Sequence, residues 1–165
     1  MIEKLPDSNA IKSEGPPDKP EDWPRLFEGH LNAGALEAVI ALYEPGATII
    51  APSGETLVGR ERIRSLLASM IEAKTCLHSR VVKAVSADGI ALLLTDFDGT
   101  TGDGSGKTGA IRHKAIEVLR RQPNGSWKLI LGDPRGRDEL GDAAPNTESS
   151  VAGAGLLARF APNTI

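Results

Sequence analysis

The chain has 165 residues, 40% of them hydrophobic, and a formal net charge of −3. That length and composition suit one folded domain with its own core. The slightly acidic balance argues against a dedicated nucleic-acid-binding protein, which normally carries a basic excess.

The N-terminal part predicts a flexible tail followed by two helices. Residues 1–21 are rich in proline and charged residues and show no periodicity, as a flexible tail does. A helix is expected from Asp22 onward, with Pro24 tolerated in its first turn. The next helix is indicated by apolar residues spaced i, i+3, i+4 and i+7 on one face, which are Leu36, Val39, Ile40 and Tyr43.

A strand and a third helix follow. Glu44-Pro45-Gly46 should end the second helix, because proline cannot continue it. Residues 47–51 are short, apolar and partly β-branched, which predicts a buried strand. After the turn at 52–54, Gly59 precedes an apolar stripe that predicts a helix over about residues 60–73.

The second half predicts a sheet. Strands are expected over 75–87, 90–98, 111–122 and 127–131, with turn signals at 88–89 and 123–125 and a glycine-rich loop over 99–109. Short turns make successive strands antiparallel. We therefore expect an α+β domain over residues 22–136, in which three helices cover one face of a curved sheet. Residues 137–165 are interpreted as a C-terminal tail, flexible or docking on a partner.

Asp96-Phe97-Asp98-Gly99-Thr100 is similar to the first motif of haloacid-dehalogenase-like phosphatases, in which the leading aspartate is the nucleophile. Gly132-Asp133 and Asp138 resemble that family's last metal-binding motif. The family's parallel sheet requires crossover helices between its strands. The predicted hairpins leave no room for them, so the phosphatase is the lesser alternative.

Other motifs do not predict a metal or a cofactor. Gly106-Lys107-Thr108 resembles the end of a phosphate-binding loop, but Thr101 stands where the first glycine is needed. The three histidines show no ligand spacing. No stretch reaches the roughly 20 apolar residues of a membrane span, and the first residues lack the apolar core of a signal peptide. We expect a cytoplasmic protein without membrane contact, and the lone Cys76 excludes an internal disulfide.

Three segments carry a resemblance to a known family, namely NAGALEAVIALYEPGATI, GETLVGRERIR and EVLRRQPNGSWKLILGDP. With them, the chain resembles the SnoaL-like domains of the nuclear transport factor 2-like superfamily, which includes ketosteroid isomerases. The resemblance implies a cystatin-like cone, formed by a strongly curved mixed or antiparallel sheet wrapped by three N-terminal helices, with a pocket inside. It also implies a homodimer through the outer face of the sheet.

The same resemblance places the ketosteroid isomerase residues on this sequence. The catalytic base falls on Ala51 and an oxyanion donor on Phe27, neither of which can do that chemistry. The second acidic group falls on Glu117, and the supporting tyrosine is Tyr43. Isomerase chemistry of that type is therefore not expected, although one acidic group remains.

Alternation along residues 111–122 puts His113 and Glu117 on one strand face, which the resemblance places inside the cone. A buried glutamate should have a raised pKa and could exchange protons near neutral pH. Glu117 and His113 are thus the candidate catalytic residues. The remaining pocket residues are expected to be Phe27, Tyr43, Ala51, Leu66, Leu67, Thr95, Phe97, Ala115 and Ile130.

These observations predict a protein that binds a small, mostly apolar molecule, with Glu117 as acid/base in an isomerase, cyclase or hydrolase reaction. No cofactor and no nucleic acid are expected. The main alternative is a binding or dimerisation module without chemistry, because one fold supports both kinds of function.

Overall fold

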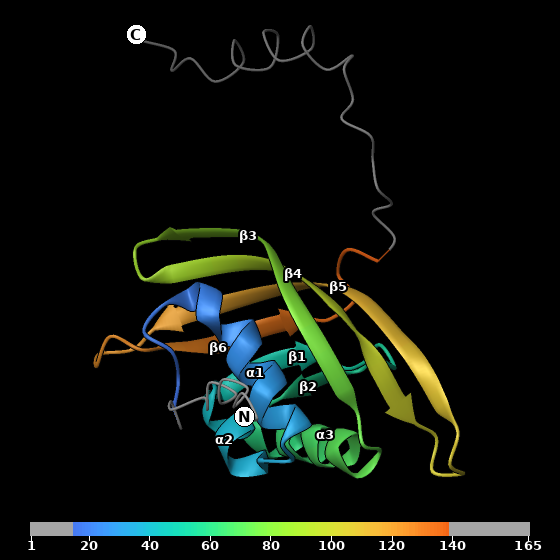
Figure 1. Cartoon of the computed structure of the whole chain (residues 1–165). Coiled ribbons are helices and arrows are strands. Elements are labelled where there is room, and N and C mark those ends of the chain that lie inside the picture. The colour runs from blue at the N-terminus through green and yellow to red at the C-terminus, as the bar shows by residue number, and fades with distance from the viewer. Residues whose placement is uncertain (1–14, 139–165) are drawn as a thin grey trace, which may run out of the picture.

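The computed structural model describes residues 15–138. A six-stranded sheet, in the order β2-β1-β6-β5-β4-β3, bends around the helices, which cover its concave face (Figure 1). Strands β1 and β6 are parallel, whereas all other neighbours are antiparallel. The arrangement is the curved mixed sheet of an α+β cone.

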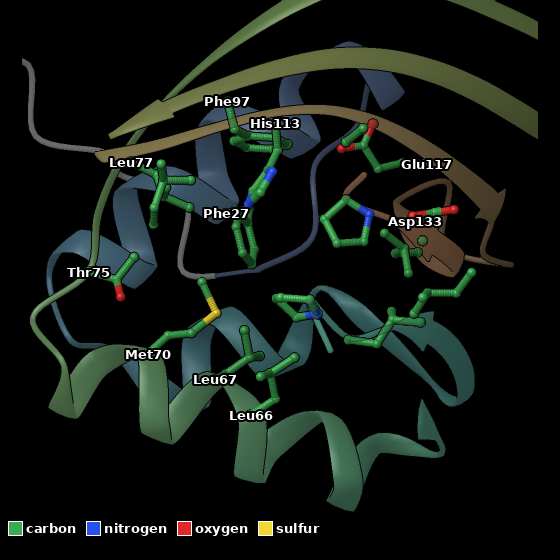
Figure 2. A pocket seen from close by; sticks show the side chains of 18 of the residues that line it. Phe27, Leu66, Leu67, Met70, Thr75, Leu77, Phe97, His113, Glu117 and Asp133 are labelled. Atoms are coloured by element: carbon green, nitrogen blue, oxygen red, sulfur yellow. The ribbon is translucent and has the colours of Figure 1, made fainter. Parts of the chain in front are cut away.

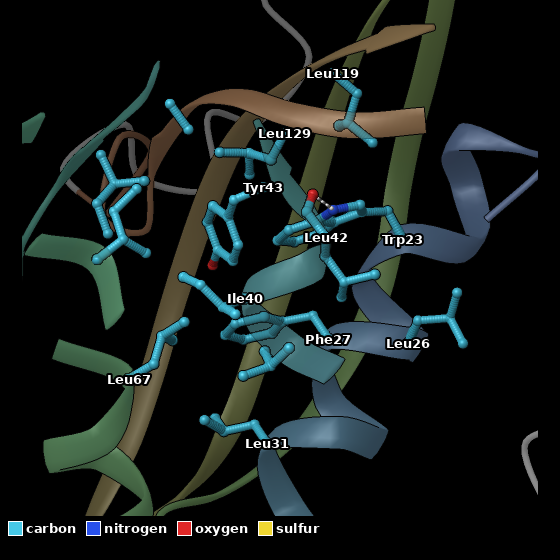
Figure 3. Packing of buried hydrophobic residues seen from close by; sticks show 14 of the residues in the cluster. Trp23, Leu26, Phe27, Leu31, Ile40, Leu42, Tyr43, Leu67, Leu119 and Leu129 are labelled. Atoms are coloured by element: carbon cyan, nitrogen blue, oxygen red, sulfur yellow. Dashed lines mark hydrogen bonds between the residues drawn. The ribbon is translucent and has the colours of Figure 1, made fainter. Parts of the chain in front are cut away.

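The N-terminal helices supply one wall of the core. A 3-10 turn, Pro20–Asp22, leads into α1 (Trp23–Asn32), and α2 is Leu36–Ala41. The indole of Trp23 donates a 3.0 Å hydrogen bond to the carbonyl oxygen of Leu42 within the buried cluster (Figure 3). This bond ties α1 to the end of α2 and satisfies the buried indole N–H of Trp23, which would otherwise be costly.

The second helix is shorter than the sequence predicts. Tyr43 already belongs to β1 (Tyr43–Ile50), so Glu44-Pro45-Gly46 lies inside a strand and does not terminate the helix. The register between β1 and β6 shifts between Tyr43 and Thr48. Such an irregularity tolerates a proline, which cannot donate a ladder hydrogen bond. The prediction of a strand starting at residue 47 was therefore wrong by four residues.

A short strand, β2 (Thr56–Val58), pairs with β1 and was not predicted. Helix α3 (Arg60–Glu72) follows, as expected, and buries Ile63 and Leu67. It packs against α1, α2 and β1. None of the helices in residues 15–138 is long and apolar enough to cross a membrane.

The remaining strands are β3 (Cys76–Ala87), β4 (Ile90–Gly102), β5 (Thr108–Arg121) and β6 (Trp127–Asp133). The hairpin turn at Asp88-Gly89 is present, with both residues at positive φ. The predicted loop over 99–109 is wrong, because β4 runs to Gly102. A Cβ on Gly99 would lie 2.0 Å from the carbonyl oxygen of Cys76, so this glycine serves a close backbone approach inside the sheet.

Side chains of α1 fix this helix against β3. Asn32 donates to the carbonyl of Leu77 and accepts from its amide, both at 2.8 Å. Glu28 accepts hydrogen bonds from the amide and the hydroxyl of Ser79, at 2.8 and 2.7 Å. These bonds hold α1 over the concave face, where Phe27 faces Phe97 edge to face at a centroid distance of 6.0 Å.

Candidate functional site

A cavity of about 290 Å³ lies between the concave face of the sheet and helices α1 and α3. Figure 2 shows Leu66, Leu67 and Met70 rising from α3 on one side, and His113 and Glu117 descending from the sheet on the other. The walls are mainly apolar. Such a cavity suits a small apolar molecule held in place by a few polar groups.

Eight of the predicted site residues line this cavity: Phe27, Tyr43, Leu66, Leu67, Phe97, His113, Ala115 and Glu117. Three do not. Thr95 is fully buried and contacts Glu117, while Ala51 is buried outside the lining. Leu129 takes the place expected for Ile130. The pairs Leu119–Leu129 and Val118–Leu131 leave Ile130 as an extra, unpaired residue in β6, and such a bulge interrupts the alternation of side chains along the strand.

Glu117 is the buried carboxylic acid of this pocket. Its side chain is 4% exposed, and its Oε2 accepts a 2.9 Å hydrogen bond from the hydroxyl of Thr95. Burial raises the pKa of Glu117 to about 7, against the smaller opposing effects of the Thr95 hydrogen bond and the positive charge of Arg137. Near neutral pH the carboxyl is therefore present in both protonated and ionised forms.

Tyr43 lines the cavity from the first residue of β1. Burial, together with the negative charge of Glu117, raises the pKa of Tyr43 far above its usual value. The phenol therefore keeps its proton. The ring packs edge to face on Trp23 at 5.6 Å, which fixes its position in the wall.

His113 stands four residues before Glu117 on the same face of β5 and directly opposite Phe97 on β4. Its Nδ1 lies 3.1 Å from Oδ2 of Asp138. Asp138 follows the last strand and was not predicted as part of the site. The sequence pointed to Asp138 only through the phosphatase-like motif and gave no local signal for a contact with His113, because that contact depends on how the chain returns to β5 after β6.

Asp96 and Asp98, the aspartates of the first phosphatase-like motif, do not line the cavity. Asp96 and Asp98 are in the middle of β4, between two antiparallel neighbours. Asp96 pairs with Arg80 and Arg137, and Asp98 pairs with Arg112. In residues 15–138 no three His, Cys, Asp or Glu side chains come together in a way that could hold a metal ion. This topology is not the parallel sheet of the phosphatase fold, so the phosphatase alternative is not supported.

The bent sheet, the three covering helices and the pocket between them define a cystatin-like α+β fold. Residues 24–130 match the SnoaL-like domain family, and the chain belongs to this family. No curated protein shows a sequence match.

Solved structures share the fold at low sequence identity. A ketosteroid isomerase-like protein from Erwinia carotovora atroseptica is 20% identical with a TM-score of 0.62, covering 68% of this chain and 89% of its own. A domain of unknown function with a cystatin-like fold from Nostoc punctiforme is 18% identical with a TM-score of 0.59, covering 70% and 73%. A nuclear transport factor 2-like protein from Novosphingobium aromaticivorans is 14% identical with a TM-score of 0.58, covering 68% and 76%.

Proposed function

We propose that the protein binds a small, mostly apolar molecule in the cone pocket and exchanges a proton with it through Glu117. The observation that carries this proposal is a buried carboxyl facing a mainly apolar cavity of about 290 Å³. Burying a carboxyl costs free energy, and a titratable group whose pKa is perturbed by burial in a cavity is a candidate functional group.

The chemistry follows from the surroundings of the carboxyl. Oε2 of Glu117 is held by Thr95, and among the contacts of the described residues none engages Oε1. With its pKa raised to about 7 by burial, Glu117 can take a proton from the ligand or give one to it. Isomerisation, cyclisation and hydrolysis all need such a transfer.

A thermal-shift screen tests this proposal. Ligands that bind the native state raise the melting temperature by mass action, so small aromatic and polycyclic molecules are screened against the wild type, Glu117→Gln and Glu72→Gln. Glu72 is an exposed glutamate at the end of α3 and serves as the matched control. We expect a ligand whose shift changes in Glu117→Gln and not in Glu72→Gln. Equal shifts in all three proteins would refute the role of Glu117.

A binding module without chemistry is the second candidate. The observation that favours it is the absence of the ketosteroid isomerase base and donor, because Ala51 and Phe27 stand at those positions. Ligand binding without turnover of any bound molecule would support this candidate. The cytoplasmic location stays a prediction.

We also propose a homodimer through the outer face of the sheet. One row of cross-strand partners, Val85, Leu92, Val118 and Leu131, crosses four strands. Three of its members are large and exposed, Val85 at 51%, Leu92 at 40% and Leu131 at 50%. Leu94 and Ile116 form the next paired row on the same face. A contiguous apolar surface of this kind is typical of a protein interface, and a second copy would cover it.

A further inference from the structure

The chain beyond β6 returns to the edge of β5. The pairing of β5 with β6 reaches only from Arg121 to Ile116, opposite Asp133. Past that point, the amide of Arg137 donates a 2.9 Å hydrogen bond to the carbonyl of Lys114. The amide of Lys114 donates a 2.7 Å hydrogen bond to Oδ1 of Asp138. The last described residues therefore lie along the edge of β5 beyond the end of β6 and place Asp138 beside His113.

The charge of Asp138 fixes the donor in its contact with His113. Burial raises the pKa of Asp138, but hydrogen bonds from Lys114, His113 and Arg135 outweigh burial and hold this pKa below its usual range. Asp138 is therefore ionised near neutral pH and can only accept hydrogen bonds. In the 3.1 Å contact, Nδ1 of His113 must be the donor. A neutral imidazole with its proton on Nδ1 has an unprotonated Nε2.

The free nitrogen belongs to a pocket-lining ring. Figure 2 shows the imidazole of His113 reaching from β5 into the cavity, toward Phe27. Among the contacts of residues 15–138, none is made by Nε2 of His113. His113 and Glu117 are separated by four residues, or about 13 Å along an extended strand. At that separation, the two polar groups would contact different parts of one bound molecule.

We propose that Asp138 is a positioning residue that holds His113 in the Nδ1–H tautomer and so presents Nε2 to the pocket as a hydrogen-bond acceptor. The ligand class that fits is an elongated apolar molecule with a donor group, such as a hydroxyl, at the end remote from Glu117. This ligand class depends on the function proposed above. The tautomer does not, and it can be measured without any ligand.

The first experiment is ¹⁵N NMR of the histidine side chains, at a pH where the His113 ring is neutral. We expect a protonated, pyrrole-type Nδ1 and a pyridine-type Nε2 in the wild type. In Asp138→Asn, a substantial fraction should move to the Nε2–H tautomer, while Asp98→Asn, which removes a carboxylate paired with Arg112, should leave the spectrum unchanged. An Nε2–H tautomer in the wild type overturns the proposal, even if the Asp138 variant fails to fold.

The second experiment measures the affinities of 4,4′-dihydroxybiphenyl and 4-hydroxybiphenyl by calorimetry. A second hydroxyl that donates to Nε2 should improve binding to the wild type and to Asp98→Asn by about fivefold, as one added hydrogen bond does. In Asp138→Asn the preference should fall to the small statistical advantage of a symmetric molecule. A preference that survives in Asp138→Asn overturns the ligand class. If neither compound binds the wild type, the pocket proposal fails, and the NMR result alone decides the role of Asp138.

Discussion

The hydroxyl of Thr95, which has no exposed surface, donates a 2.9 Å hydrogen bond to the carboxyl of Glu117. The two residues lie on adjacent strands, where Thr95 pairs with Ala115, two residues before Glu117. The bond favours the ionised carboxyl and therefore partly offsets the effect of burial on the pKa of Glu117. Thr95 thus tunes Glu117 without itself lining the pocket.

Removing this donor should raise the pKa of Glu117. In Thr95→Val the carboxylate loses its hydrogen bond while the shape of the side chain is preserved, so ionisation becomes harder and the pKa moves above about 7. Carbon-13 NMR titration of the glutamate carboxyls measures the shift directly. Thr95→Ser keeps the hydroxyl and should keep the wild-type value. A pKa that stays in place in Thr95→Val would contradict the assigned role of the bond.

The raised pKa of Glu117 also makes stability depend on pH. The pKa of Glu117 is about 7 in the folded protein and 4.5 for an ordinary glutamate. The folded state is therefore more stable, relative to the unfolded state, when Glu117 is protonated than when it is ionised. This contribution is complete below the unfolded pKa and is lost as pH rises through the folded one. Relative to Glu117→Gln, the wild type should lose about 3 kcal/mol of unfolding free energy between about pH 4 and about pH 8. Urea unfolding of both proteins across that range measures the difference, and parallel curves would disprove it.

Gly99 should not tolerate a side chain. A Cβ there would meet the carbonyl oxygen of Cys76 at 2.0 Å, whereas a Cβ on Gly109 would meet nothing within 4 Å. We expect Gly99→Ala to destabilise the domain by about 3 kcal/mol or more, because the backbone of β3 must move. Gly109→Ala is the matched control and should change stability little. Equal melting temperatures for the two variants would show that β3 and β4 separate easily at this point.

If the outer face of the sheet forms the homodimer interface, a charge introduced into the apolar row that contains Leu92 should weaken dimerisation. Leu92→Asp places a carboxylate in the middle of that row and should shift sedimentation equilibrium toward the monomer, because a buried unpaired charge is costly. Val58→Asp serves as the control, since Val58 is 60% exposed on β2, outside the row. A Leu92 variant that associates as tightly as the wild type would move the interface elsewhere, and a monomeric wild type would exclude it.

The elements that could be predicted from the sequence are those that depend on residues close together in the chain. Apolar periodicity predicted the three helices, and the Asp88-Gly89 signal predicted the hairpin between β3 and β4. Pro45 and Gly99 misled the prediction because proline and glycine usually mark ends and loops. Here Pro45 lies at a register shift and Gly99 at a close approach between strands. Both features depend on partners far away in the sequence.

The candidate site likewise has some residues that local sequence patterns predicted and others that only contacts between distant segments determine. Alternation along β5 predicted that Glu117 and His113 share one face, and the family resemblance placed that face inside the cone. Both residues line the cavity. The bulge at Ile130 and the return of Asp138 to β5 depend on contacts between distant segments. Periodicity in the sequence does not reveal such long-range contacts, so only the structure could show that Leu129 and Asp138 belong to the site.

The contacts between α1 and β3 have a consequence for solubility. Strand β3 is the last strand on its side of the sheet, and an edge strand with free backbone groups invites pairing with other molecules. Asn32 and Glu28 occupy the peptide groups of Leu77 and the amide of Ser79 with side-chain atoms. The two side chains act as a substitute neighbour for the edge, so that stretch of β3 cannot recruit a foreign strand while α1 stays in place.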